Sequence, residues 1–115
     1  MKERRIYMRV LRFIVDGEKI YQDPSCDFGG LFPGRNYDVQ AEFTFSHDWD
    51  NKTKVAAFWS IRGAEYEPQV LKDNTCMIPP EALDRAAFKI QVLAKKGNTN
   101  ISTNKLVILQ TGTRR

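Results

Sequence analysis

One stretch of the chain, residues 43–59, limits the possible folds more than any other. It reads FTFSHDWDNKTKVAAFW and brings five aromatic rings and the only histidine into a predicted strand, a tight polar corner and a second strand. Large aromatic side chains dominate the energetics of protein cores. Two strands joined across such a corner are typical of a β-sandwich, so we predict that Phe43, Phe45, Trp49 and Phe58 form its structural core.

Alternating apolar and polar residues predict strands on both sides of this stretch. Residues 37–45 place every second side chain on an apolar face, as in a half-buried strand. Residues 8–15 show a similar pattern, and the Asp-Gly pair at 16–17 predicts a hairpin turn of type I′. A proline pair opens the one predicted helix, near residues 79–86. About seven or eight short strands predict an all-β, immunoglobulin-like antiparallel β-sandwich.

The chain length and its apolar runs bound the domain organisation. The 115 residues suffice for one domain with a core of its own. We expect an N-terminal arm at residues 1–7, a single β-sandwich domain at 8–112 and a basic tail at 113–115. The longest apolar runs are far shorter than the roughly 20 residues of a membrane span. No apolar signal-peptide segment follows the positively charged start, so we expect synthesis in the cytoplasm and no membrane partner.

The net charge of +4 and the pI near 9.2 raise the question of nucleic-acid binding. The basic residues are spread over both ends and a predicted turn at 95–96 rather than gathered in a stripe with exposed aromatic rings. We therefore expect no nucleic-acid partner and interpret the charge as an aid to solubility.

Residues with catalytic or metal-binding chemistry are few. His47 lies between Ser46 and Asp48, but catalytic triads are assembled in space rather than from sequence neighbours, and a Gly-x-Ser-x-Gly pattern is absent. The acids at 48 and 50 lack the remainder of a calcium loop. Cys26 and Cys76 are solitary, so we expect free thiols. The sequence thus predicts no enzyme, no catalytic residue, no metal and no cofactor.

Two places are predicted to contact a partner. Phe58 and Trp59 are neighbours on a strand and face opposite sides, so Trp59 is expected to leave the core for a second packing layer or a subunit contact. The Gly- and Pro-rich stretch 22–36 carries three apolar side chains that would be costly to expose. They are Phe28, Leu31 and Phe32, and they either dock on a partner or cap the sandwich.

Several short motifs carry a resemblance over residues 8–110. They are MRVLRFIVDG at 8–17, FTFSHDW at 43–49, GAEY at 63–66, CMIPPEAL at 76–83 and TNKLV at 103–107. In this order and spacing the chain resembles small immunoglobulin-like β-sandwich proteins and modules of the virions of phages and prophages of Gram-positive bacteria.

The resemblance implies a role in display and assembly rather than catalysis. It implies a non-enzymatic virion structural protein, placed either on the capsid as a decoration or head fibre or in the tail or baseplate. The implied partners are phage virion proteins or further copies of this chain, and the implied location is the virion. Two alternatives stay open. One is a phage accessory protein that binds a host factor, and the other is a carbohydrate-binding β-sandwich with Trp49 and Trp59 as sugar platforms.

Overall fold

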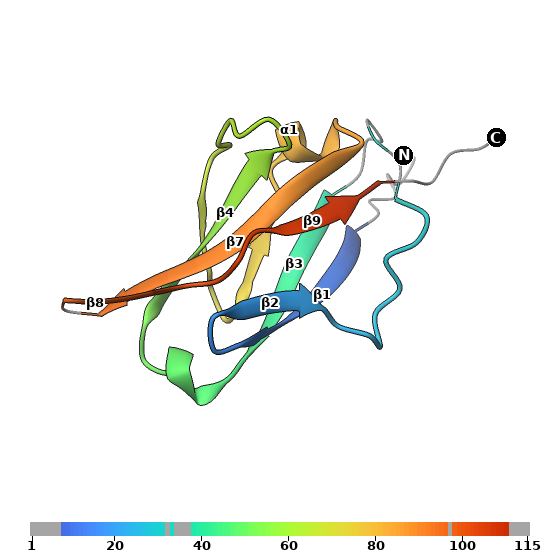
Figure 1. Cartoon of the computed structure of the whole chain (residues 1–115). Coiled ribbons are helices and arrows are strands. Elements are labelled where there is room, and N and C mark those ends of the chain that lie inside the picture. The colour runs from blue at the N-terminus through green and yellow to red at the C-terminus, as the bar shows by residue number, and fades with distance from the viewer. Residues whose placement is uncertain (1–7, 32, 34–37, 97, 111–115) are drawn as a thin grey trace, which may run out of the picture.

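The computed structural model describes residues 8–31, 33, 38–96 and 98–110. The predicted arm at 1–7, the predicted tail at 113–115 and Phe32 lie outside these residues. Within them the chain forms two β-sheets and one short helix, which confirms the predicted all-β sandwich (Figure 1).

The first sheet has four strands in the order β2-β1-β3-β6. The bounds of these strands are Met8–Asp16 for β1, Lys19–Gln22 for β2, Asp38–Phe45 for β3 and Thr75–Met77 for β6. The second sheet has five strands, with β5, β4 and β7 side by side and both β8 and β9 paired with β7. Their bounds are Thr53–Ser60 for β4, Gln69–Val70 for β5, Ala87–Lys96 for β7, Thr99–Ser102 for β8 and Leu106–Leu109 for β9.

Four central strands follow the immunoglobulin arrangement. In that fold strands B and E are neighbours in one sheet, and strands C and F are neighbours in the other. Here β3 pairs with β6 and β4 pairs with β7, while the chain passes from one sheet to the other between β3 and β4 and again between β6 and β7. Strand β9 pairs with β7 in the place of strand G. The immunoglobulin-like part of the prediction is therefore confirmed for this set.

One strand pair departs from the predicted antiparallel arrangement, because β1 and β3 run parallel. The segment after β2 continues along β1 towards the start of that strand, as the hydrogen bond from Asp23 N to Arg12 O shows (3.0 Å). The chain then enters β3 beside Met8, so both strands point the same way. Parallel neighbours need a connection of about a dozen residues or more, which β2 and the long segment after it supply.

Two tight turns differ in type, and one of them corrects a prediction. The β1–β2 hairpin is confirmed, but Gly17 has a φ of 60° and Glu18 is not among the residues with positive φ. Positive φ at the first central residue alone indicates type II′ rather than the predicted type I′. Asp73 and Asn74, between β5 and β6, both have positive φ (55° and 62°), as a type I′ turn requires.

The aromatic corner of residues 45–49 is locked to the β1–β2 turn. The indole N–H of Trp49 donates to Gly17 O (2.8 Å), and Gly17 N donates to Ser46 Oγ (2.9 Å). The Trp49 ring lies 5.4 Å from that of Phe45 and is fully buried. His47–Trp49 form a single 3₁₀ turn. Phe43, Trp49 and Phe58 belong to the core, and Phe45 packs against it while partly exposed.

The predicted helix is shorter than expected, and a short break separates the last two strands. The helix α1 spans Pro80–Leu83, inside the predicted region 79–86. The strands β8 and β9 are separated by Thr103, Asn104 and Lys105. In this break Ile20 N donates to Asn104 Oδ1 (2.9 Å), so the side chain of Asn104 caps the free edge of β2 and joins the two sheets.

Candidate functional site

The outer face of the five-stranded sheet, which is turned toward the viewer in Figure 1, carries side chains in rows across its strands, as the strand register shows. Core residues such as Phe58, Ile90 and Ile108 face inward, so their strand neighbours face outward. One row runs across β4, β7 and β9, and another runs across β5, β4, β7 and β8. The first row is Trp59, Lys89 and Val107, and the second is Val70, Val55, Leu93 and Ser102. We call these seven residues, with Ala57, Gln91, Lys105 and Leu109, the outer face.

Several side chains of the outer face are apolar and exposed. Val70, Val107 and Leu109 are 66%, 43% and 58% exposed. A shallow hollow of about 510 Å³ lies over the β8 end of the face, where Val55 and Leu93 form part of its lining. Val107 and Leu109 are next-but-one neighbours on β9, whereas Val70 lies at the opposite edge of the sheet. Exposed apolar side chains that share one face of a small domain mark it as a candidate interaction surface.

Trp59 lies on this face, as predicted from its place next to Phe58. Its ring is partly buried, and the Lys105 Nζ lies 3.8 Å from the ring centroid. Such a cation–π contact holds the lysine over the tryptophan. The buried indole N–H of Trp59 has no hydrogen-bond partner among the described residues. Buried donors in native proteins are nearly always satisfied, so this N–H sets Trp59 apart from an ordinary packing residue.

The strands that form the outer face carry charge of one sign. None of the five described strands of this sheet contains Asp or Glu. Lys89 and Lys95 project from β7, and Lys105 projects from the loop before β9. Glu65, the bridge partner of Trp59, places one carboxylate beside this face. The strands themselves carry only positive charge, and a complementary surface would place carboxylates opposite the lysines.

One edge of the sheet at this face is open to pairing. Gln110 N donates to Ala86 O (2.7 Å), so alternate residues along β9 bond to β7. The backbone groups of Val107 and Leu109 therefore face away from β7. No described strand pairs with them on that side. Such an edge adds backbone donors and acceptors to the apolar side chains of the same two residues.

The outer side of the four-stranded sheet is organised differently. Arg12 and Glu42 are register partners on β1 and β3 and form an ion pair across them (2.7 Å). Met8, Tyr21 and Met77 are exposed around this pair. An ion pair at the centre leaves no continuous apolar surface over the middle of this sheet.

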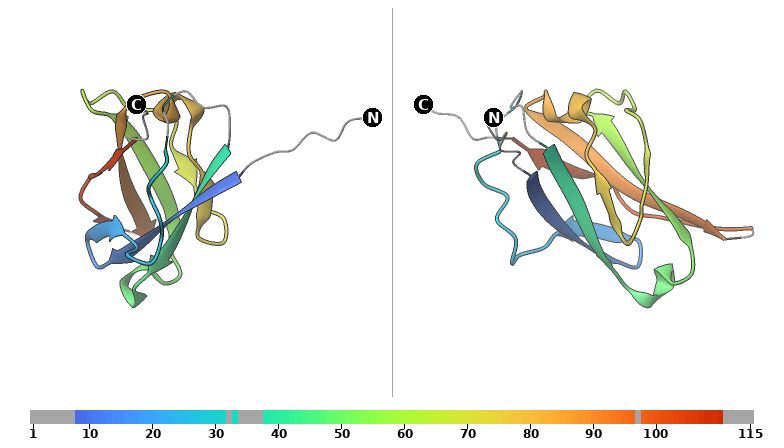
Figure 2. Two further views of the ribbon diagram at one scale, coloured as in Figure 1. Left: turned by 90° about the vertical axis from the view of Figure 1, so that its right-hand side faces the viewer. Right: turned by 180° about the vertical axis from the view of Figure 1, so that it is seen from behind.

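The loop that was predicted to dock on a partner lies along the side of the sandwich (Figure 2, left). The Arg9 guanidinium donates to Asp27 O (2.8 Å) and Gly29 O (2.6 Å) and holds the loop against β1. The Phe28 ring packs edge-on against Phe13 (5.4 Å), and Leu31 is buried. Phe32 lies outside the described residues. The described part of the loop thus matches the alternative that these side chains cap the sandwich.

The polar residues of the corner do not assemble into a site. His47 is fully exposed and contacts only the Asp50 carboxylate (3.0 Å) among the described side chains. Within the described ranges, no three His, Cys, Asp or Glu side chains lie close enough together to hold a metal ion. Cys26 and Cys76 are free thiols. Burial raises the pKa of Cys76 to about 12, so this thiol stays protonated and unreactive at neutral pH.

Sequence reasoning found Trp59 but missed its neighbours on the outer face. Lys105 and Val107 lie some 45 residues further along the chain, and only the β4–β7–β9 pairing places them beside it. A signal was present in the run LVIL at 106–109, because a strand with apolar residues at every position has no polar face to give to solvent.

No protein-family model, curated protein or solved structure matches this chain. None of the described helices is long and apolar enough to cross a membrane.

Proposed function

We propose that this protein is a non-catalytic attachment module of a phage virion that docks through its outer face on another virion protein. The supporting observation is that an apolar sheet face with an open strand edge carries lysines and no strand carboxylate. The virion context comes from the resemblance of the sequence motifs to phage and prophage β-sandwich modules.

The charge of the face favours a different protein over a second copy as the occupant. Two copies that met face to face would bring Lys89, Lys95 and Lys105 of each chain together, and like charges across an interface are unfavourable. A partner with an apolar patch ringed by Asp and Glu would bury Val107, Leu109 and Trp59 and compensate the lysines. Many identical copies on a particle would make even a weak contact of this kind effective.

The two alternative functions make different use of the same residues. Trp49 is buried with its N–H bonded to Gly17, so it offers no platform for a sugar. Trp59 has its ring under Lys105. A host factor with an acidic surface would suit the outer face as well as a virion protein does, and the location of the protein separates these two functions.

A matched pair of substitutions tests the proposal. Val107→Glu introduces a carboxylate into the outer face, and Met77→Glu introduces one at a similarly exposed position of the other sheet. Purified particles from the host that encodes this chain are analysed by mass spectrometry for the wild-type protein and both variants. We expect wild type and Met77→Glu in the particles and a loss of at least about tenfold for Val107→Glu, since each buried unpaired charge costs more than 1.4 kcal/mol.

Two outcomes would contradict the proposal. Absence of the wild-type protein from purified particles would exclude a virion role. Equal incorporation of both variants would place the docking surface elsewhere, even if the protein is a virion component. Circular dichroism of the two variants verifies that each retains the fold.

A further inference from the structure

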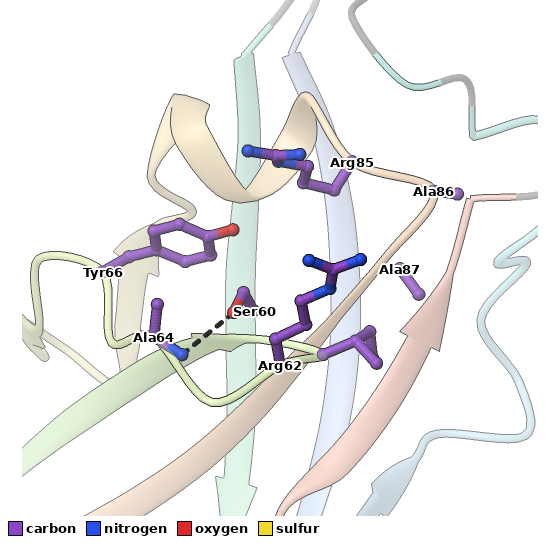
Figure 3. A pocket seen from close by; sticks show the side chains of 8 residues that line it. Ser60, Arg62, Ala64, Tyr66, Arg85, Ala86 and Ala87 are labelled. Atoms are coloured by element: carbon purple, nitrogen blue, oxygen red, sulfur yellow. Dashed lines mark hydrogen bonds between the residues drawn. The ribbon is translucent and has the colours of Figure 1, made fainter.

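A pocket with two arginines opens at one end of the sandwich, between the end of β4 and the helix α1 (Figure 3). Its volume is about 580 Å³, within the range of small-molecule sites. Polar lining comes from Arg62, Arg85, Tyr66 and Ser60. Apolar lining comes from Ile61, Ala64, Ala86 and Ala87.

The polar groups of this pocket converge and are available to a ligand. Figure 3 shows that the guanidinium groups of Arg62 and Arg85 border the same pocket and that the Tyr66 hydroxyl is directed into it. Among the described residues, neither guanidinium has an ion pair or a hydrogen bond, and no Asp or Glu lines the pocket. Ser60 Oγ accepts a hydrogen bond from Ala64 N (2.9 Å), which leaves its O–H free to donate.

The segments that carry the two arginines are held in place. On one side, Ser60 N donates to Ala64 O (2.7 Å) and Gly63 N donates to Ser60 O (3.0 Å), which closes the turn around Arg62. On the other side, the buried Gln110 side chain donates to Leu83 O (2.8 Å) and Arg85 O (2.6 Å). A backbone fixed in advance lowers the entropy that a ligand must remove on binding.

We infer that this pocket binds a phosphate ester with a small apolar stem. The two guanidinium groups can only donate and carry positive charge, and both hydroxyls can also donate, so the lining favours a ligand that is an acceptor and an anion. Guanidinium groups match phosphate oxygens in geometry, and a phosphate monoester carries close to two negative charges at pH 7, which two arginines balance. The apolar lining and the volume exceed what an inorganic phosphate fills. This site does not depend on the outer face or on a virion role.

Phenyl phosphate is a suitable probe, with inorganic phosphate and phenol as its two halves. Titration of the full chain is followed by ¹H–¹⁵N correlation spectra, which also show whether each variant is folded. We expect phenyl phosphate to shift the amide signals of residues 60–66 and 85–87 and to bind at least about tenfold more tightly than either half. The affinity falls with added salt and as the pH drops through about 6, where the phosphate dianion gains a proton.

Three variants make the assignment specific. Arg85→Gln removes one guanidinium group. Arg62→Lys keeps the positive charge at the other position but loses the bidentate hydrogen-bond geometry of the guanidinium. Each substitution should weaken binding by about tenfold or more. Lys19→Gln makes the same change in charge as Arg85→Gln on β2, far from the pocket, and should have no effect. Should Lys19→Gln weaken binding as much as Arg85→Gln, general charge attraction explains it. Equal binding of phenol or of inorganic phosphate, or shifts outside the pocket, would also overturn the inference.

Discussion

The two tryptophans of this protein occupy opposite kinds of environment. Trp49 is fully buried in the aromatic corner, and its indole N–H donates to Gly17 O (2.8 Å). Trp59 lies on the outer face with its N–H unpartnered among the described residues and with Lys105 over its ring. The same residue type therefore joins two parts of the fold at one position and lies on the proposed docking surface at the other. Hydrogen bonding and burial distinguish these roles, since both rings are equally hydrophobic.

Removal of each ring gives the largest expected difference between the two regions. We expect Trp49→Ala to lower the free energy of unfolding by about 3–5 kcal/mol, the range for large aromatic residues in a core. Trp59→Ala should cost clearly less, because its ring is only partly buried. Urea unfolding of both variants measures the two effects. A larger loss for Trp59→Ala would reverse the roles assigned to the two rings.

Cys76, on the inner side of β6, makes the free energy of unfolding depend on pH, unlike a solvent-exposed thiol. Burial raises the pKa of Cys76 to about 12 from an ordinary value of 9.0, so the folded protein retains a proton that the unfolded chain loses above pH 9. The stabilisation is complete below pH 9 and falls by about 1.4 kcal/mol per pH unit as the pH rises towards 12. Unfolding of wild type and Cys76→Ala between pH 8 and 11 measures it. Parallel curves for the two proteins would show that the thiol is not buried.

A smaller substitution isolates the hydrogen bond of Trp49 from its volume. Trp49→Phe deletes the N–H and leaves Gly17 O without its partner, at a cost of about 1–3 kcal/mol. Trp59→Phe deletes an N–H that has no partner and should cost less than about 0.5 kcal/mol. Thermal unfolding of the pair checks the difference. Equal costs would mean that the Trp49 bond contributes nothing to stability.

The smallest expected effect concerns the contact that covers Trp59. We expect Lys105→Ala to lower the free energy of unfolding by only about 0.5–1 kcal/mol, the size of an exposed cation–π contact. The same change should shift the fluorescence emission of Trp59 to longer wavelength, because water replaces the lysine over the ring. Measurement in the Trp49→Phe background removes the second fluorophore. An unchanged emission spectrum would contradict the contact.

Local patterns in the sequence predicted much of the core and part of the candidate site. The alternation of 39–45 and the five rings of 43–59 mark inward-facing side chains, and strand geometry assigns Phe58 and Trp59 to opposite faces. The Asp-Gly pair predicted the hairpin but not its type, since φ of Glu18 depends on how the whole turn joins β1 to β2. The role of loop 22–36 stayed ambiguous, because the Arg9 contacts to that loop span 18 and 20 residues.

The alternation of side chains along a strand and the residue preferences of turns act within a few residues. The sequence alone therefore predicted the sandwich, the aromatic corner and the position of Trp59 on the outer side of its sheet. Three features required pairing between distant segments. These are the parallel β1–β3 register, the approach of Lys105 to Trp59, and the convergence of Arg62 and Arg85 on one pocket. Each joins residues 23–46 positions apart, and only the packed chain brings them within contact distance.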